Sequence, residues 1–209
     1  MDKSLAAARL TTFSDVCQVQ YNKTVVPACD LSFTPYIPSR TEFADGALPF
    51  NDPMLKDQWH YINDGKNSGS NTAVAGADIA VKDAWKLTAG DRRIIVAVID
   101  SPVKYDHPDL AANMWTNEKE LNGLPGIDDD GNGYVDDIHG LNFLEKNEFG
   151  NHGTHIAGTI VAVNNNGIGV CGIAGGNGVD TGARLMSIGI SDNRDNFAED
   201  YLQARGYVY

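Results

Sequence analysis

The fold of this protein is decided by the stretch Ile94-Ile-Val-Ala-Val-Ile-Asp100. Its six consecutive apolar residues, most of them β-branched, predict a strand that is buried on both faces. Such strands are typical of the centre of a parallel sheet that helices cover on both sides. Asp100 ends the run, and open α/β sheets place their functional groups at the carboxyl ends of their strands.

Helical and strand patterns alternate around this stretch. Residues 77–86 have the periodicity of a helix that stops at Gly90. Further along, we expect a helix over residues 152–163, a strand over 184–190 and a last helix over 197–205. This alternation predicts an α/β fold with a parallel sheet.

Composition and charge exclude several classes of partner. The 209 residues are 42% hydrophobic, which is enough for one substantial core, and the formal net charge is −12. Nucleic acids and anionic membrane surfaces need a basic face, so neither is an expected partner. No window approaches 18 apolar residues, so we expect no membrane span, and the first twenty residues lack the apolar core of a signal peptide.

The three cysteines do not form a disulfide framework. Cys17 and Cys29 could pair in an oxidising compartment, and the sequence leaves that open. Cys171 lies in an apolar run and is predicted to be a small buried residue.

Asp100 and His152 are the candidate catalytic residues. A carboxylate beside an imidazole can hold the ring in one tautomer and stabilise the imidazolium that forms during acyl transfer. His152 starts a predicted helix, where the positive end of the helix dipole favours a neutral ring that can act as a base. Gly153 and Gly158 would let this helix approach its neighbours closely. Taken singly, either residue could instead be a cap or an ordinary surface group.

Two segments together resemble the Asp and His signatures of the subtilase family of serine proteases. They are Val96-Ala-Val-Ile-Asp-Ser101, followed by His107-Pro-Asp-Leu110, and Gly150-Asn-His-Gly-Thr-His-Ile-Ala-Gly-Thr-Ile160. The resemblance implies a subtilisin-like parallel-sheet fold, with Asp100 as the orienting acid and His152 as the general base. It also implies endopeptidase activity on protein or peptide substrates, and a secreted or cell-envelope location.

The resemblance also suggests where the domains lie. Asn51-Asp-Pro53 and Gln58-Trp59 look like the start of a mature subtilase domain. Residues 50–209 are therefore expected to be the N-terminal portion of the catalytic domain, and residues 1–49 a propeptide-like tail or linker. The oligomeric state is not indicated.

The family's serine nucleophile is missing from this pattern. After His152 the sequence contains only Ser187 and Ser191, and neither lies in the Gly-Thr-Ser motif of the family. We therefore expect a chain that is truncated before the C-terminal half of the fold and inactive by itself. A second departure is Ser101-Pro102, where the family usually has Ser/Thr-Gly.

An acidic loop is a candidate calcium site. Its oxygen-bearing residues alternate as in the first part of an EF-hand loop, with Gly133 at the sixth position, although position 12 is His139 rather than Glu. The alternative is a solvated acidic loop. The expected ligands are Asp128, Asp130, Asn132, Tyr134 (through its carbonyl) and Asp136.

Resemblance to the family implies a second calcium site. Its side-chain ligands would be Asp52, Asp109 and Asn165, the last in a loop that has one residue more than the common form of the family. Calcium is thus the expected cofactor. Two rival functions remain: a non-catalytic regulatory or peptide-binding remnant of a subtilase, and a calcium-binding structural module.

Overall fold

The computed structural model describes residues 18–21, 24–27, 42–43, 47–66, 69, 71–144 and 149–191. At the N-terminus, β1 (Gln18–Tyr21) and β2 (Thr24–Pro27) form an antiparallel pair. Cys17, Cys29 and the predicted helix over 197–205 lie outside the described residues.

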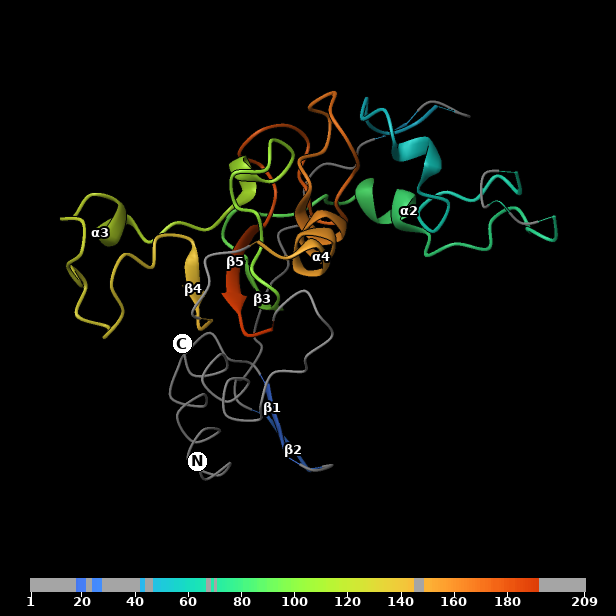
Figure 1. Ribbon diagram of the computed structural model, residues 1–209. Helices are drawn as coiled ribbons and strands as arrows, with labels where there is room; N and C mark the ends of the chain where they lie inside the picture. The colour runs from blue at the N-terminus through green and yellow to red at the C-terminus, as the bar shows by residue number, and fades with distance from the viewer. Residues whose placement is uncertain are drawn as a thin grey trace.

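A three-stranded parallel sheet carries the site (Figure 1). It consists of β3 (Ile95–Asp100), β4 (Gly140–Asn142) and β5 (Arg184–Gly189), in the order β3-β5-β4. The predicted α/β fold with a parallel sheet is confirmed. The strand predicted over 184–190 is β5, whereas β4 was not predicted, because three residues including a glycine carry no strand pattern.

Among the described helices, α4 (Asn151–Val161) packs against the sheet. It contacts β3 and β5 and confirms the helix expected from residue 152 onward. Apolar residues of the two strands and the helix form the main core, together with residues of the connecting loops. The buried members are Val98, Val103, Leu110, Met114, Ala157, Val161, Ala162, Ala183 and Leu185.

The remaining helices are short. In the described part of the chain they are α2 (Val81–Trp85), α3 (Glu118–Leu121) and two 3-10 turns, Leu55–Asp57 and Ala111–Asn113. The prediction of a helix over 77–86 is therefore wrong in length. Ala80 adopts a left-handed conformation with φ of 54°, which interrupts the helix before Val81.

The prediction that β3 is central and covered on both faces is wrong for the described part of the chain. β3 lies at the edge of the described sheet, and β5 is the central strand. Val98 faces the core under α4, but Ile95 is 42% exposed. A continuous apolar run thus indicates a strand suited to burial on both faces. Whether both faces are in fact covered depends on which other segments pack against them.

A second apolar cluster, in which half of the buried members are aromatic, anchors the segment before the sheet. It comprises Phe50, Leu55, Tyr61, Val81, Trp85 and Cys171, and Cys171 is fully buried as predicted. The Gln58 side chain donates to the Cys171 carbonyl at 2.9 Å and accepts from the Cys171 amide at 2.8 Å. Residues 50–62 are thereby tied to the loop that follows α4.

Within the described ranges, no helix has both the length and the apolar character needed to cross a lipid bilayer.

Candidate active site

The site lies where the strands end. In the register of the sheet, Asp100 of β3 is opposite Gly189 of β5, and Asn142 of β4 is opposite the same glycine. The last residues of the three strands are therefore level. This edge is where parallel sheets present their functional groups.

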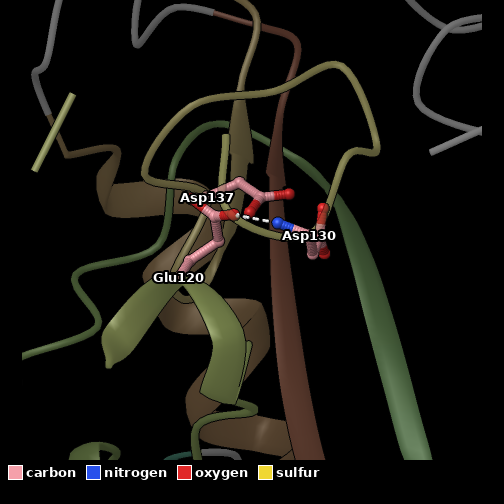
Figure 2. A group of neighbouring side chains, drawn as sticks. All are labelled: Glu120, Asp130 and Asp137. Atoms are coloured by element: carbon pink, nitrogen blue, oxygen red, sulfur yellow. Dashed lines mark hydrogen bonds between the residues drawn. The ribbon is translucent and has the colours of Figure 1, made fainter. Parts of the chain in front are cut away.

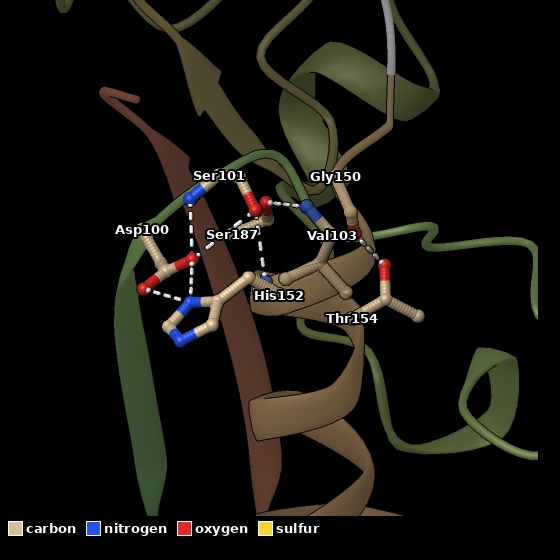
Figure 3. A network of polar contacts seen from close by, with 8 residues as sticks. Asp100, Ser101, Val103, Gly150, His152, Thr154 and Ser187 are labelled. Atoms are coloured by element: carbon tan, nitrogen blue, oxygen red, sulfur yellow. Dashed lines mark hydrogen bonds and ion pairs between the residues drawn. The ribbon is translucent and has the colours of Figure 1, made fainter. Parts of the chain in front are cut away.

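Asp100 and His152 form a hydrogen-bonded pair at this edge (Figure 3). The Nδ1 atom of His152 lies 2.8 Å from Oδ1 and 2.9 Å from Oδ2 of Asp100. The Asp100 side chain is 20% exposed, whereas that of His152 is 74% exposed. A carboxylate bound to Nδ1 favours the tautomer that carries its proton there, which leaves Nε2, on the exposed ring, as the basic nitrogen.

Local interactions place His152 in the first turn of α4. Gly150 is the residue before the helix, and its amide donates to the Pro102 carbonyl at 2.6 Å. Thr154 donates its hydroxyl to the Gly150 carbonyl at 2.6 Å and accepts from the Lys104 amide at 3.0 Å. The start of the helix is thus bonded to the loop that leaves β3, so the two catalytic candidates are held by adjoining segments.

Ser187 is placed in the sheet rather than beside the imidazole. It lies within β5, is 9% exposed, and accepts a hydrogen bond from the Val103 amide at 3.0 Å. Figure 3 shows its hydroxyl directed toward Val103. Its hydroxyl therefore helps to hold the loop after β3.

The acidic loop turns many of its oxygens toward its own backbone. Asp128 accepts from the amides of Gly131, Asn132 and Gly133, at 2.7–3.1 Å. Asp136 accepts from the Gly126 amide at 2.9 Å, and Asn132 accepts from the Tyr134 amide at 2.8 Å. Asp128, Asn132 and Asp136, three of the predicted ligands, therefore stabilise the conformation of the loop. Asp130 is the predicted ligand that belongs to the group of carboxylates described next.

Three carboxylates from different segments meet below this loop (Figure 2). Glu120 of α3, Asp130 and Asp137 each offer an oxygen, and these atoms lie within 4.8 Å of one another. Glu120 is 4% exposed and Asp137 is 2% exposed. The Asn117 side chain donates to both aspartates, at 2.9 and 3.0 Å. This group of three is called the carboxylate cluster below.

Glu120 was missed by the sequence reasoning because it precedes the acidic loop by eight residues. It accepts from the amides of Asp129, Asp130 and Asp136, at 2.8, 3.1 and 2.9 Å. The available signal was Asn117, a residue type that caps helices and thereby predicts a short helix just before the loop. In the structure the Asn117 side chain does cap α3, since it accepts from the Lys119 amide.

The second predicted metal site brings two buried carboxylates together. Asp52 and Asp109 are each 2% exposed, and Asp52 accepts from the amides of Asn165 and Asn166 at 2.6 and 3.3 Å. Burial raises the pKa of Asp109 above its ordinary value, and the charge of Asp52 adds to this, while hydrogen bonds from Asn166 and Val170 oppose it.

The side chain that reaches this second site is Asn166 rather than the predicted Asn165. Asn166 donates to Asp109 at 2.9 Å, whereas the Asn165 side chain donates to Asn177 at 3.4 Å.

The family model for the subtilases matches residues 91–209, which is more than half of the chain and includes both Asp100 and His152. The chain belongs to the subtilase family. The resemblance inferred from the two sequence signatures is therefore confirmed, together with the subtilisin-like fold.

Several proteases resemble this subtilase chain in sequence. Subtilisin-like protease 1 of Plasmodium vivax is 45% identical over 107 residues, which cover 48% of the chain and 17% of that protein. PC3-like endoprotease variant B of Hydra vulgaris is 34% identical over 160 residues, which cover 74% of the chain and 18% of that protein. The chain thus spans less than a fifth of these curated relatives.

Solved structures agree with the subtilase fold. The serine protease of Aeromonas sobria, in complex with a chaperone, superposes with a TM-score of 0.51 at 28% identity. The superposition covers 78% of the subtilase chain and 23% of that protease.

Proposed function

We propose that this chain supplies the acid and the base of a serine endopeptidase active site that cleaves proteins or peptides. The observation that carries the proposal is the double contact between the Asp100 carboxylate and Nδ1 of His152 at the carboxyl end of β3. Asp100 holds the ring so that Nε2 accepts the proton of an attacking hydroxyl and later gives it to the leaving amine. Secretion or attachment to the cell envelope stays a prediction from the family.

The nucleophile in this proposal comes from a segment that is not among residues 1–209. Ser187 is buried and bonded to the Val103 amide, which supports a structural role for its hydroxyl. Acyl transfer also needs donors aimed at the oxyanion, and the loss of one such donor typically costs about 10²–10³ in rate. We therefore propose that residues 1–209 alone do not hydrolyse peptide bonds.

The test compares the chain with longer products of the same gene. Purified chain and products extended past codon 209 in each reading frame are treated with a fluorophosphonate probe and with casein. We expect no labelling of the chain, and labelling of one extended product that is abolished by His152→Ala. Labelling of Ser187 or Ser191 in the chain, lost in His152→Ala, would refute the assignment of the nucleophile. No labelled product in any frame would favour the non-catalytic rival.

We also propose that the carboxylate cluster of Glu120, Asp130 and Asp137 binds calcium. The donor set fits the ion, because Ca²⁺ takes oxygen ligands and above all carboxylates. Two of the three groups are buried, where like charges repel strongly unless a cation compensates them. Bound calcium would neutralise this charge and join α3 to the end of the acidic loop. The buried pair of Asp52 and Asp109 is proposed as a second calcium site on the same grounds.

Calorimetric titration of chelator-treated chain with calcium tests the cluster. We expect Asp137→Asn to weaken binding by more than about tenfold. Asp129→Asn is the matched control, because Asp129 lies in the same loop but outside the cluster and bonds the Leu124 amide. Equal heats for all three proteins would refute the cluster. Loss of binding in Asp136→Asn but not in Asp137→Asn would instead favour the ligand set expected from the loop pattern.

A further inference from the structure

Ser101 connects the two members of the catalytic pair. Its amide donates to Oδ1 of Asp100 at 2.6 Å, and its hydroxyl donates to the same oxygen at 3.1 Å. The same hydroxyl accepts from the amide of Gly153, the residue after His152, at 2.9 Å. Ser101 is 2% exposed, so its own hydrogen bonds are shielded from solvent.

The chain around Ser101 offers little alternative support for the carboxylate. Pro102 follows, and because proline has no amide hydrogen, the next residue cannot donate to Asp100. On the other side, a Cβ atom on Gly153 would lie 2.0 Å from the Ser101 carbonyl oxygen. The first turn of α4 therefore packs directly against the backbone of Ser101 (Figure 3). The Ser101 hydroxyl adds a hydrogen bond to this contact, which it accepts from the Gly153 amide.

We infer that Ser101 is a positioning residue for the Asp100–His152 pair, an inference that rests on the function proposed above. The amide and the hydroxyl of Ser101 both donate to Oδ1 of Asp100 and orient it toward Nδ1 of His152. The oxygen of the same hydroxyl accepts from the Gly153 amide and so keeps the first turn of α4, which carries His152, next to Asp100. One serine thus sets both the carboxylate and the helix that carries the imidazole. Its hydroxyl hydrogen goes to Asp100, so Ser101 acts on the reaction through the pair and does not attack a substrate.

Removing the hydroxyl has two local effects. In Ser101→Ala the Gly153 amide loses its acceptor, and Oδ1 of Asp100 loses one of its two donors from this residue. Hydrogen bonds to charged groups are stronger than neutral ones, so the orientation of the carboxylate is expected to loosen. The consequence is a weaker bond between Asp100 and the Nδ1–H group of His152.

The experiment measures the exchange rate of the Nδ1–H proton of His152 with water. The proton is observed in the downfield region of the ¹H NMR spectrum, in chain labelled with ¹⁵N at histidine. A proton held by a carboxylate exchanges slowly with water, and we expect its exchange to quicken about tenfold in Ser101→Ala. Ser101→Thr, which keeps the hydroxyl, is expected to retain the slow exchange. If Ser101→Ala does not fold, Ser101→Cys makes the same comparison, because its thiol is a weaker donor.

Thr159→Val is the matched control. Thr159 also lies in α4 and uses its hydroxyl in a hydrogen bond, but it donates to the His155 carbonyl, away from Asp100 and the start of the helix. Unchanged exchange in Ser101→Ala, or an equal acceleration in Thr159→Val, would overturn the positioning role and leave the proposed pair intact. A wild-type chain with no slowly exchanging Nδ1–H proton would overturn the pair itself, and the inference with it.

Discussion

Two glycines of α4 allow the contact between the helix and β3 to be tested by the same substitution. At Gly153, an added Cβ would lie 2.0 Å from the carbonyl oxygen and 3.0 Å from the carbonyl carbon of Ser101. At Gly158, the nearest atom would be a methyl carbon of Val170 at 4.0 Å, an ordinary contact. Gly153→Ala and Gly158→Ala therefore differ in crowding and not in chemistry.

The magnitudes follow from these distances. An added Cβ at Gly153 would lie roughly 1.5 Å closer to the Ser101 carbonyl oxygen than an ordinary separation of about 3.5 Å. The atoms that it meets belong to the backbone, which cannot rotate away. Such overpacking costs about 1–3 kcal/mol, and loss of the bond to the Ser101 hydroxyl adds about 1 kcal/mol. Replacing a helical glycine by alanine returns at most about 1 kcal/mol. We expect Gly153→Ala to lower the free energy of unfolding by about 1–3 kcal/mol, and Gly158→Ala to raise it by about 0.5–1 kcal/mol.

Thermal and urea unfolding, followed by circular dichroism, measures both variants. For a chain of this length the expected gap corresponds to a difference in Tm of at least about 3 °C. A Gly153→Ala variant that is as stable as Gly158→Ala would refute the close approach of α4 to Ser101. It would also remove the structural basis for placing His152 against Asp100.

Three further outcomes can be measured by urea unfolding. Gln58→Leu should lower the free energy of unfolding by about 2–4 kcal/mol, because it leaves a buried amide and a buried carbonyl unpaired; a loss under about 0.5 kcal/mol would contradict this. Val98→Ala should cost about 2 kcal/mol and the exposed Ile95→Ala under about 1 kcal/mol, and equal costs would mean that the outer face of β3 is covered. Burial lowers the pKa of His60, and the charge of His155 adds to this, so the free energy of unfolding should decrease as pH falls below about 6.5. His60→Gln should lose less stability over the same pH range, and identical pH profiles for the two proteins would contradict this.

Local sequence patterns determined the elements that carry the active site. The apolar runs that became β3 and β5, and the helix that begins beside His152, are specified by side-chain periodicity over a few residues. The pairing of Asp100 with His152 was also expected, since both residues belong to signatures that identify the family. These features could be predicted because each depends on a short segment, or on a resemblance between segments.

Tertiary structure alone decided how those elements are arranged and which polar groups meet. Strand order placed β3 at the edge of the described sheet, although its composition suits burial on both faces. Glu120 joined Asp137 in the carboxylate cluster, and Asn166 reached Asp109, because α3 and the loop after α4 bring distant segments together. The sequence determined which residues can form strands, helices and oxygen-rich loops. Only the packed chain decided their partners, because hydrogen bonds and burial between distant segments depend on the relative positions of whole elements and not on the residues beside each group.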